Sequence, residues 1–368
     1  MRTANAPRPF DHGGDYTGEY LDFSANIAPF GLPEGVRYAL LDLAQGDGAE
    51  RYPDPDCRAL RACIAAKETL DPDMVLCGNG ASELLYRTVR FLQPKTALVV
   101  EPTFSEYEKA LRETGCDVRK VFAEPAYNEE GALCGQSFAV PDLSGALTPD
   151  LDLLVLCSPN NPTGRSLSPE EMTVLLKVCR ANGTLVLWDA CFADFMDLEE
   201  DPDRQARYDQ FLPFAVANFE NLLVLKSLTK TYAIPGLRLG YLLCSDTERV
   251  RALASFGPPW SVSAPAQAAG VAALQDNNYL ESVRQYVSQE KLRLWLALLD
   301  LPCWCRRGDG NFLLLCSKRA DLAERLKEHG ILVRDCANFD GLDTHWVRFA
   351  VKTREENDEL LAALRAEL

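Results

Sequence analysis

The sequence has too few basic residues to balance its acidic ones: 38 Lys and Arg stand against 54 Asp and Glu, which gives a formal net charge of −16 at pH 7. An acidic surface repels nucleic-acid phosphates and anionic lipids. We therefore expect no nucleic-acid partner and no membrane partner. If the ligand is an anion, arginine side chains inside its site must hold it against the field of the whole protein.

Two further features are missing: an apolar stretch at the start of the sequence and an uninterrupted apolar run long enough to span a bilayer. The first ten residues contain no apolar stretch of the kind that forms a signal peptide. Residues 252–275 carry no charge, but three prolines interrupt them, which a bilayer span tolerates poorly. We interpret that run as a buried loop followed by a core helix.

The 13 cysteines are scattered, and most lie in apolar runs where a thiol is a small core residue. The tight pair Cys303 and Cys305 lacks a second pair of ligands at zinc-site spacing. We therefore expect no metal and a reducing, cytoplasmic location.

From about residue 71, short apolar runs alternate with helical periods, which is typical of an α/β fold with a mostly parallel sheet and helices on both faces. We expect strands at 97–101, 153–157, 185–189, 222–226 and 239–244, and helices at 81–92, 105–114, 168–181, 247–255, 264–275 and 278–299. After residue 300 the pattern predicts a small α+β unit, with strands at 301–306, 311–317, 331–335 and 345–351 and helices at 319–329 and 354–368. The expected division is an N-terminal segment (1–45) on the small domain or cleft, a large domain (46–280) and a small domain (281–368).

Two segments place polar groups where a phosphorylated cofactor would bind. In CGNGASELL, Gly78 and Gly80 permit a tight turn before a helix whose free N–H groups can hold a phosphate, although an ordinary turn has the same appearance. In SPNNPTG, Asn161 follows a strand at the sheet edge where open sheets bind ligands, so it could donate to a phenolate oxygen. This segment, too, is consistent with a plain Asn/Pro/Gly turn.

Two more segments carry charge. Asp189 closes the apolar strand of LVLWDACF, either as a cap or as a buried carboxylate that needs a cation. In SLTKTYAIPGLRLG, Lys230 ends a strand among hydroxyls, with Arg238 eight residues later. Pyridoxal 5′-phosphate (PLP) requires a lysine for a Schiff base, an aspartate for its ring nitrogen, an asparagine for its ring oxygen and a binding site for its phosphate. The four segments together offer these groups.

These motifs, together with HGG at 12–14, LDFSANIAPFG, RYPDPDCRALR and PTFSEYEKAL, resemble the fold-type I PLP-dependent aminotransferases of class I/II. Within that family the chain is similar to histidinol-phosphate aminotransferases and, more closely, to threonine-phosphate decarboxylases of cobalamin biosynthesis. The resemblance implies a PLP-dependent transferase fold and a homodimer in which Tyr52 reaches the neighbouring active site. It also implies the cofactor-binding and catalytic roles of a set of residues. That set comprises Lys230, Asp189, Asn161, Phe104, Ala81, Ser82, Ser227, Thr229 and Arg238.

The same resemblance implies that Arg348, in HWVRFAV, binds the substrate carboxylate and that Arg334, in GILVRDC, helps to bind an anionic tail. His12 and Asn26 are further substrate-binding candidates, although a plain N-terminal loop explains them equally. The expected reaction is decarboxylation of O-phosphothreonine or O-phosphoserine. The alternative is transamination of histidinol phosphate with 2-oxoglutarate. A non-catalytic relative would be expected to lack Lys230 or Asp189.

One departure from the family pattern accompanies this resemblance. The expected Asp-Glu-Ala-Phe reads Asp-Ala-Cys-Phe at 189–192. Phe192 stands where the aminotransferase branch usually has a tyrosine, as is common among the decarboxylases. The missing glutamate is not expected to contact the cofactor, so we interpret its loss as a tuning difference.

Overall fold

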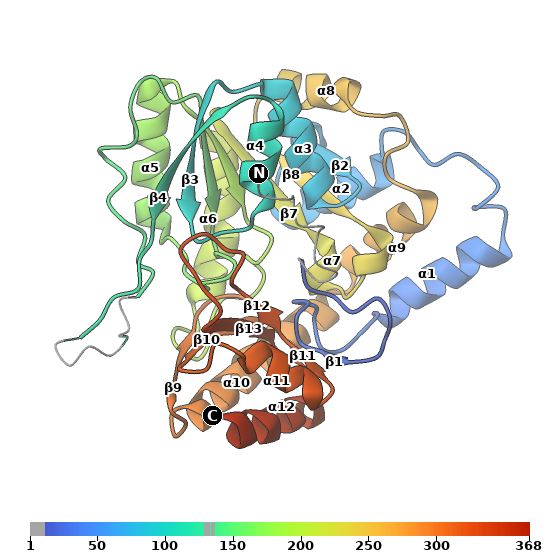
Figure 1. The fold of residues 1–368 in the computed structure, drawn as a ribbon. Coiled ribbons are helices and arrows are strands. Elements are labelled where there is room, and N and C mark those ends of the chain that lie inside the picture. The colour runs from blue at the N-terminus through green and yellow to red at the C-terminus, as the bar shows by residue number, and fades with distance from the viewer. Residues whose placement is uncertain (1–11, 129–132, 134–136) are drawn as a thin grey trace, which may run out of the picture.

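The computed structural model describes residues 12–128, 133 and 137–368, so the first eleven residues of the expected N-terminal segment lie outside it. A seven-stranded sheet forms the centre (Figure 1). Its order is β2 (Val75–Gly78), β8 (Gly240–Leu243), β7 (Leu222–Ser227), β6 (Leu185–Asp189), β5 (Leu153–Cys157), β3 (Thr96–Glu101) and β4 (Asp117–Phe122). β8 runs opposite to the other six strands and so is antiparallel to both β2 and β7. The prediction of a mostly parallel sheet is confirmed.

Helices cover both faces of this sheet because its central strands are apolar on both sides. In β5, Leu154 and Leu156 point into one core and Leu153 and Val155 into the other. The first core is completed by α2 (Arg58–Glu68), α5 (Pro169–Asn182), α6 (Arg204–Asn218) and α9 (Ala264–Gln275). The second is completed by α3 (Ala81–Leu92), α4 (Glu106–Glu113) and α8 (Thr247–Phe256).

A smaller domain follows the long helix α10 (Asn277–Leu298). Its antiparallel sheet has the order β12 (Arg334–Asp335), β13 (Trp346–Ala350), β10 (Phe312–Ser317) and β9 (Cys303–Arg307), with α11 (Leu322–Glu328) and α12 (Arg354–Glu367). The single strand expected at 331–335 is two strands, because β11 (Ile331–Leu332) pairs instead with β1 (Leu21–Asp22). The N-terminal segment therefore joins the small domain through β1, while α1 (Glu34–Gln45) packs on α9. The domain boundaries at 45 and 280 remain a prediction.

The charge-free run at 252–275 differs from its interpretation. It contains the end of α8, a loop and α9, and α9 is a core helix as expected. The loop is exposed rather than buried: Pro258 and Pro259 face solvent, and Trp260 is 45% exposed. Prolines lack the N–H that a buried backbone segment must pair, which suits them to the surface. In the described part of the chain, no helix is both long enough and apolar enough to cross a bilayer.

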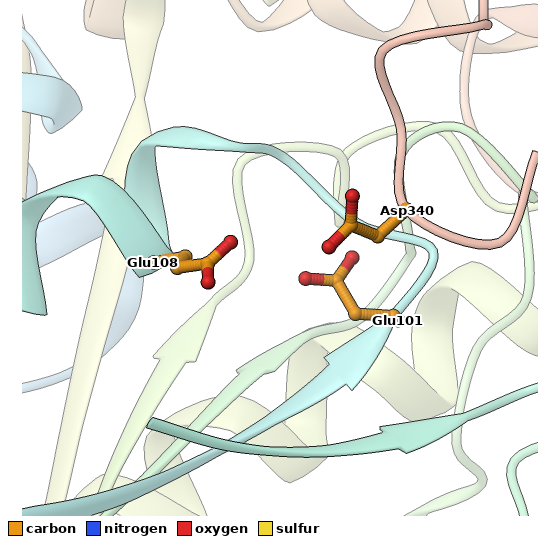
Figure 2. A group of neighbouring side chains, drawn as sticks. All are labelled: Glu101, Glu108 and Asp340. Carbon is orange, nitrogen blue, oxygen red and sulfur yellow. The ribbon is translucent and has the colours of Figure 1, made fainter. Parts of the chain in front are cut away.

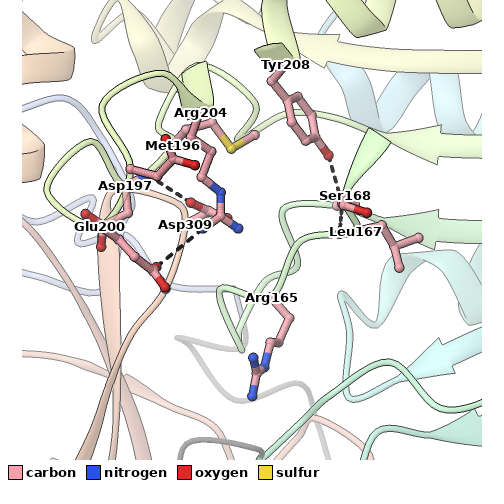
Figure 3. A network of polar contacts seen from close by, with 12 residues as sticks. Arg165, Leu167, Ser168, Met196, Asp197, Glu200, Arg204, Tyr208 and Asp309 are labelled. Atoms are coloured by element: carbon pink, nitrogen blue, oxygen red, sulfur yellow. Dashed lines mark hydrogen bonds and ion pairs between the residues drawn. The ribbon is translucent and has the colours of Figure 1, made fainter. Parts of the chain in front are cut away.

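A buried polar network joins the two domains beside the loop that follows Asn161 (Figure 3). Asp309, in the turn before β10, accepts the backbone N–H of Asp197 at 2.8 Å and forms an ion pair with Arg204 of α6 at 2.8 Å. Its own N–H donates to the carbonyl of Gly164 at 2.8 Å. These bonds fix the SPNNPTG loop against the small domain, and so bring β13 close to the carboxyl edge of the large sheet.

Candidate active site

A pocket of about 480 Å³, partly open to solvent, lies at the carboxyl ends of the central strands. This is the edge where open α/β sheets bind ligands. Six residues that the sequence placed at the site line it together: Ala81, Ser82, Phe104, Asn161, Asp189 and Lys230.

Asp189 is 9% exposed and faces this pocket. Its Oδ2 accepts the hydroxyl of Tyr107 at 2.6 Å, and its Oδ1 accepts the backbone N–H of Cys191 at 2.9 Å. Among the described residues, neither partner of Asp189 is a cation. Because a buried carboxylate is stabilised mainly by a paired positive charge, the site is suited to a cationic group of a ligand.

Lys230 lies on the short helix α7 (Leu228–Thr231), and its Nζ is 5.1 Å from the centre of the Phe192 ring. Two contacts hold this helix. The side chain of Ser227 caps its N-terminus, and the carbonyl of Lys230 accepts the N–H of Ala28 from the N-terminal segment at 2.9 Å. The amine is thereby presented to the pocket by a fixed backbone.

A buried ion cluster lies behind α7. The Oδ1 of Asp194 is 3.4 Å from both Lys226 and Arg284 and 3.8 Å from Lys67, and its Oδ2 accepts the hydroxyl of Thr231 at 3.0 Å. Burial would raise the pKa of Asp194, but the three cations outweigh it and hold the pKa well below its usual range. Since Thr231 follows Lys230, this cluster anchors the helix that carries the amine.

The residues expected to hold a phosphate lie around the start of α3. Gly80 caps this helix with φ +84° and no side-chain hydrogen bond, so the first N–H groups are open to a ligand. A Cβ at Gly80 would lie 2.7 Å from the Arg238 guanidinium, and one at Gly240 would lie 2.5 Å from the nitrogen of Ala81. Ser227 is the strand partner of Gly240, and its hydroxyl is 2.6 Å from that of Thr229. Glycines at 80 and 240 therefore leave room for the cationic and hydroxyl groups to converge.

The two predicted substrate arginines are strand partners, Arg334 on β12 and Arg348 on β13, and both are buried. Arg348 donates through one Nη to Asn161 Oδ1 and through the other to the carbonyl of Ser24 at 2.5 Å, while its Nε has no partner among the described residues. Burial lowers the pKa of Arg348 to about 10, which still leaves it a cation at neutral pH. Arg334 donates to Asn338 Oδ1 at 2.6 Å. A pair of buried cations thus lies beside the pocket of a strongly acidic protein.

The remaining candidates lie farther out. Asn26, two residues after Ser24, is buried, and its Oδ1 has no partner within the part of the chain that the structure describes. His12 Nε2 is 3.2 Å from Glu106 Oε1, with its ring 6.0 Å from that of Phe104. Tyr52 does not line the pocket.

The family described as aminotransferase class I and II matches residues 18–364. The threonine-phosphate decarboxylase of Salmonella typhimurium is 38% identical over 94% of this chain and 91% of its own length. The chain belongs to the class I and II aminotransferase family. Histidinol-phosphate aminotransferase 2 of Archaeoglobus fulgidus is 31% identical over 94% of this chain and 93% of its own.

Solved structures agree on the fold. The L-threonine-O-3-phosphate decarboxylase from Porphyromonas gingivalis superposes with a TM-score of 0.77 at 26% identity, covering 94% of this chain and 98% of that one. The histidinol-phosphate aminotransferase from Clostridium acetobutylicum gives 0.79 at 25% identity, with the same coverage. The fold-type I architecture expected from the sequence is confirmed, and the chain is a PLP-dependent enzyme.

The residues present fit this cofactor. Asp189 offers an anion without a cationic partner to the pyridine nitrogen, and Asn161 lies across the same pocket for the ring oxygen. The uncapped N-terminus of α3 and Arg238 suit a phosphate. Lys230 lines the same pocket and would supply the amine that PLP requires.

Sequence reasoning missed four residues that line the pocket: Leu85, Tyr107, Cys157 and Cys191. A usable signal existed for Tyr107, because it lies three residues after Phe104 and so one helical turn farther along the same edge. The two thiols carried no such signal. Burial raises the pKa of Cys157 to about 12, so it lines the site as a neutral side chain.

A second cluster of carboxylates is not part of this site. Glu101, Glu108 and Asp340 point toward one another at the junction of β3, α4 and the loop before β13 (Figure 2). The ammonium of Lys120 is already among them, 2.6 Å from Glu108, 3.9 Å from Glu101 and in contact with Asp340. That ammonium compensates the acidic charge, and we assign no metal here.

Proposed function

We propose that the chain decarboxylates an O-phosphorylated amino acid for assembly of the cobamide nucleotide loop. The reaction would convert L-threonine O-3-phosphate to (R)-1-aminopropan-2-yl phosphate, or O-phosphoserine to ethanolamine phosphate. The observation that carries the proposal is the 38% identity with the Salmonella decarboxylase over nearly the whole of both chains. The buried pair Arg334 and Arg348 supports it, because such a substrate carries both a carboxylate and a phosphate.

We assign the following roles to the site residues in the proposed reaction. When bound, PLP supplies an electron sink for the bond that breaks at the substrate Cα. Arg348 binds the carboxylate and orients it, Asp189 holds the proton of the pyridine nitrogen, and Lys230 delivers a proton to Cα after CO₂ leaves. Arg334, with Asn26 and His12 of the N-terminal segment, is assigned to the substrate phosphate.

Transamination of histidinol phosphate is the second candidate, and the similarity to the Archaeoglobus and Clostridium aminotransferases favours it. The same lysine and arginines would serve both reactions, since the bond held perpendicular to the cofactor ring is the one that breaks. A single-turnover experiment separates them. The holoenzyme is mixed with histidinol phosphate without keto acid, and formation of pyridoxamine phosphate is followed by absorbance. Stoichiometric formation would favour the aminotransferase, whereas its absence is expected for the decarboxylase.

The proposed enzyme is a homodimer in the cytoplasm. Tyr52 is 81% exposed and stacks on Trp260 with ring centroids 4.5 Å apart. An aromatic pair presented to solvent is typical of a protein interface, and in the proposed dimer Tyr52 reaches the cofactor phosphate of the other subunit. Unpaired cysteines throughout the described residues support a reducing compartment. Sedimentation of wild type and Tyr52→Ala, with PLP affinity measured in parallel, tests the assembly: a monomeric wild type would contradict it.

A further inference from the structure

Tyr107 makes an unusual contact for a residue of a core helix. It is 1% exposed and belongs to the apolar cluster beneath α3 and α4, yet its hydroxyl donates to Asp189 Oδ2 at 2.6 Å. The two residues are 82 positions apart and reach each other from α4 and the end of β6. The hydroxyl therefore joins a helix on one sheet face to the carboxylate that faces the cofactor pocket.

The contact constrains both the position and the charge of Asp189. With Oδ2 held by Tyr107 and Oδ1 held by the backbone of Cys191, the carboxylate plane is fixed from two sides. Each oxygen keeps a free lone pair for a further donor. Burial and the nearby Asp189 charge raise the pKa of Tyr107 well above its ordinary value of 10, so the phenol remains a neutral donor. A neutral donor lowers the proton affinity of a carboxylate, because it stabilises the charged form.

We propose that Tyr107 is a positioning residue that keeps the proton shared between Asp189 and the cofactor on the pyridine nitrogen. Without the hydroxyl, a buried carboxylate loses a donor that stabilises its charged form, so it would compete more strongly for that proton. A ring without that proton is a weaker electron sink. The inference rests on PLP as the cofactor and not on which amino acid is the substrate.

The test is Tyr107→Phe, which keeps the ring in the core and removes one oxygen. Apoenzyme is titrated with PLP, and the holoenzyme is prepared with cofactor labelled with ¹⁵N in the ring. We expect PLP affinity to fall about 10-fold, as for loss of a hydrogen bond to a charged group. The ¹⁵N resonance is expected to move toward that of a neutral pyridine. With O-phosphothreonine, kcat is expected to fall while KM stays within about twofold, because uniform substrate binding is untouched.

Tyr208→Phe is the matched control. Tyr208 is also buried, at 4% exposed, and Tyr208→Phe removes a hydroxyl that lies 3.0 Å from Ser158 Oγ, but Tyr208 does not line the pocket. We expect its ¹⁵N resonance and PLP affinity to match wild type. An unchanged ¹⁵N resonance in Tyr107→Phe would overturn the proposal.

A double-mutant cycle separates positioning from a merely structural role. If Tyr107 acts through Asp189, then Tyr107→Phe should change PLP affinity little in an Asp189→Ala background. An equal loss in both backgrounds would show that Tyr107 acts through packing and would also overturn the proposal. Because PLP binding is the readout, a negative result here leaves the proposed substrate untouched, and an incorrect substrate leaves this test valid.

Discussion

The guanidinium of Arg348 donates to the side-chain carbonyl of Asn161, a residue 187 positions earlier in the chain. One comes from the small domain and the other from the loop after a large-domain strand. The contact places the candidate substrate cation directly beside the candidate cofactor ligand. A carboxylate that binds Arg348 is therefore held at the face of the cofactor pocket.

Removal of this cation is expected to weaken use of the substrate. In Arg348→Ala, kcat/KM should fall roughly 30- to 150-fold, because a charge-assisted hydrogen-bonded pair is lost. This factor corresponds to about 2–3 kcal/mol of lost transition-state stabilisation. The measurement is steady-state kinetics with O-phosphothreonine. Arg365→Ala, on the exposed side of α12, serves as the control and should behave as wild type. An unchanged kcat/KM in Arg348→Ala would move the carboxylate site elsewhere.

Lys230 is expected to be indispensable for turnover but not for the fold. Lys230→Ala should abolish turnover and the absorbance of covalently bound cofactor, because no other lysine lines the pocket in the described residues. The circular dichroism spectrum of Lys230→Ala should match that of the wild type. Lys177→Ala, on the exposed face of α5, is the control and should match the wild type in every assay. Full activity in Lys230→Ala would remove the central assignment.

The ion cluster behind α7 should contribute strongly to stability. Asp194→Asn removes the anion that buried Lys226 shares with the partly exposed Lys67 and Arg284. It should lower the free energy of unfolding by about 3 kcal/mol at pH 7, because Lys226 keeps Glu68 at 3.4 Å. Because the folded-state pKa of Asp194 is depressed, the stabilisation is present above the ordinary aspartate pKa and is lost as pH falls below about 4. Urea unfolding across that range should show the two proteins converging in acid. A difference in free energy of unfolding between the wild type and Asp194→Asn that stays constant with pH would contradict this account.

Glu101 gives the opposite pH dependence. Burial raises its pKa to about 7, so the wild type loses stability as pH rises from the ordinary glutamate value to about 7. Glu101→Gln keeps an acceptor for the N–H of Thr103 and does not ionise. Relative to wild type it should gain about 2–3 kcal/mol between pH 4.5 and pH 8. Glu324→Gln, at an exposed position, is the control and should show no change in relative stability with pH. If the free energies of unfolding of the wild type and Glu101→Gln ran parallel across this pH range, the account would be contradicted.

Much of the large domain could be predicted because its strands are short apolar runs flanked by helical periods. β5 and β6 match their expected bounds, and so does α3. Two strands escaped prediction. β4 contains three charged residues among six at the sheet edge, and β2 is only four residues long, so neither forms a distinct apolar run. In the small domain, the break between β11 and β12 depends on pairing with β1, a contact that no local pattern encodes.

The candidate site was predictable where a motif lies at a strand end. Lys230, Asp189 and Asn161 all follow apolar strands and converge because parallel strands end at one edge. The contacts that hold these side chains in place could not be predicted in the same way. The contact of Tyr107 with Asp189 and that of Arg348 with Asn161 each join distant segments, and they depend on how helices and domains pack.

The most direct test of the central claim uses O-phosphothreonine and O-phosphoserine labelled with ¹³C in the carboxylate. Each is incubated with the holoenzyme in the absence of any keto acid, and labelled CO₂ and the amine phosphate are quantified over time. The account predicts many turnovers, with equal amounts of the two products and no pyridoxamine phosphate. No labelled CO₂ from either compound, with activity appearing only on histidinol phosphate and 2-oxoglutarate, would contradict it.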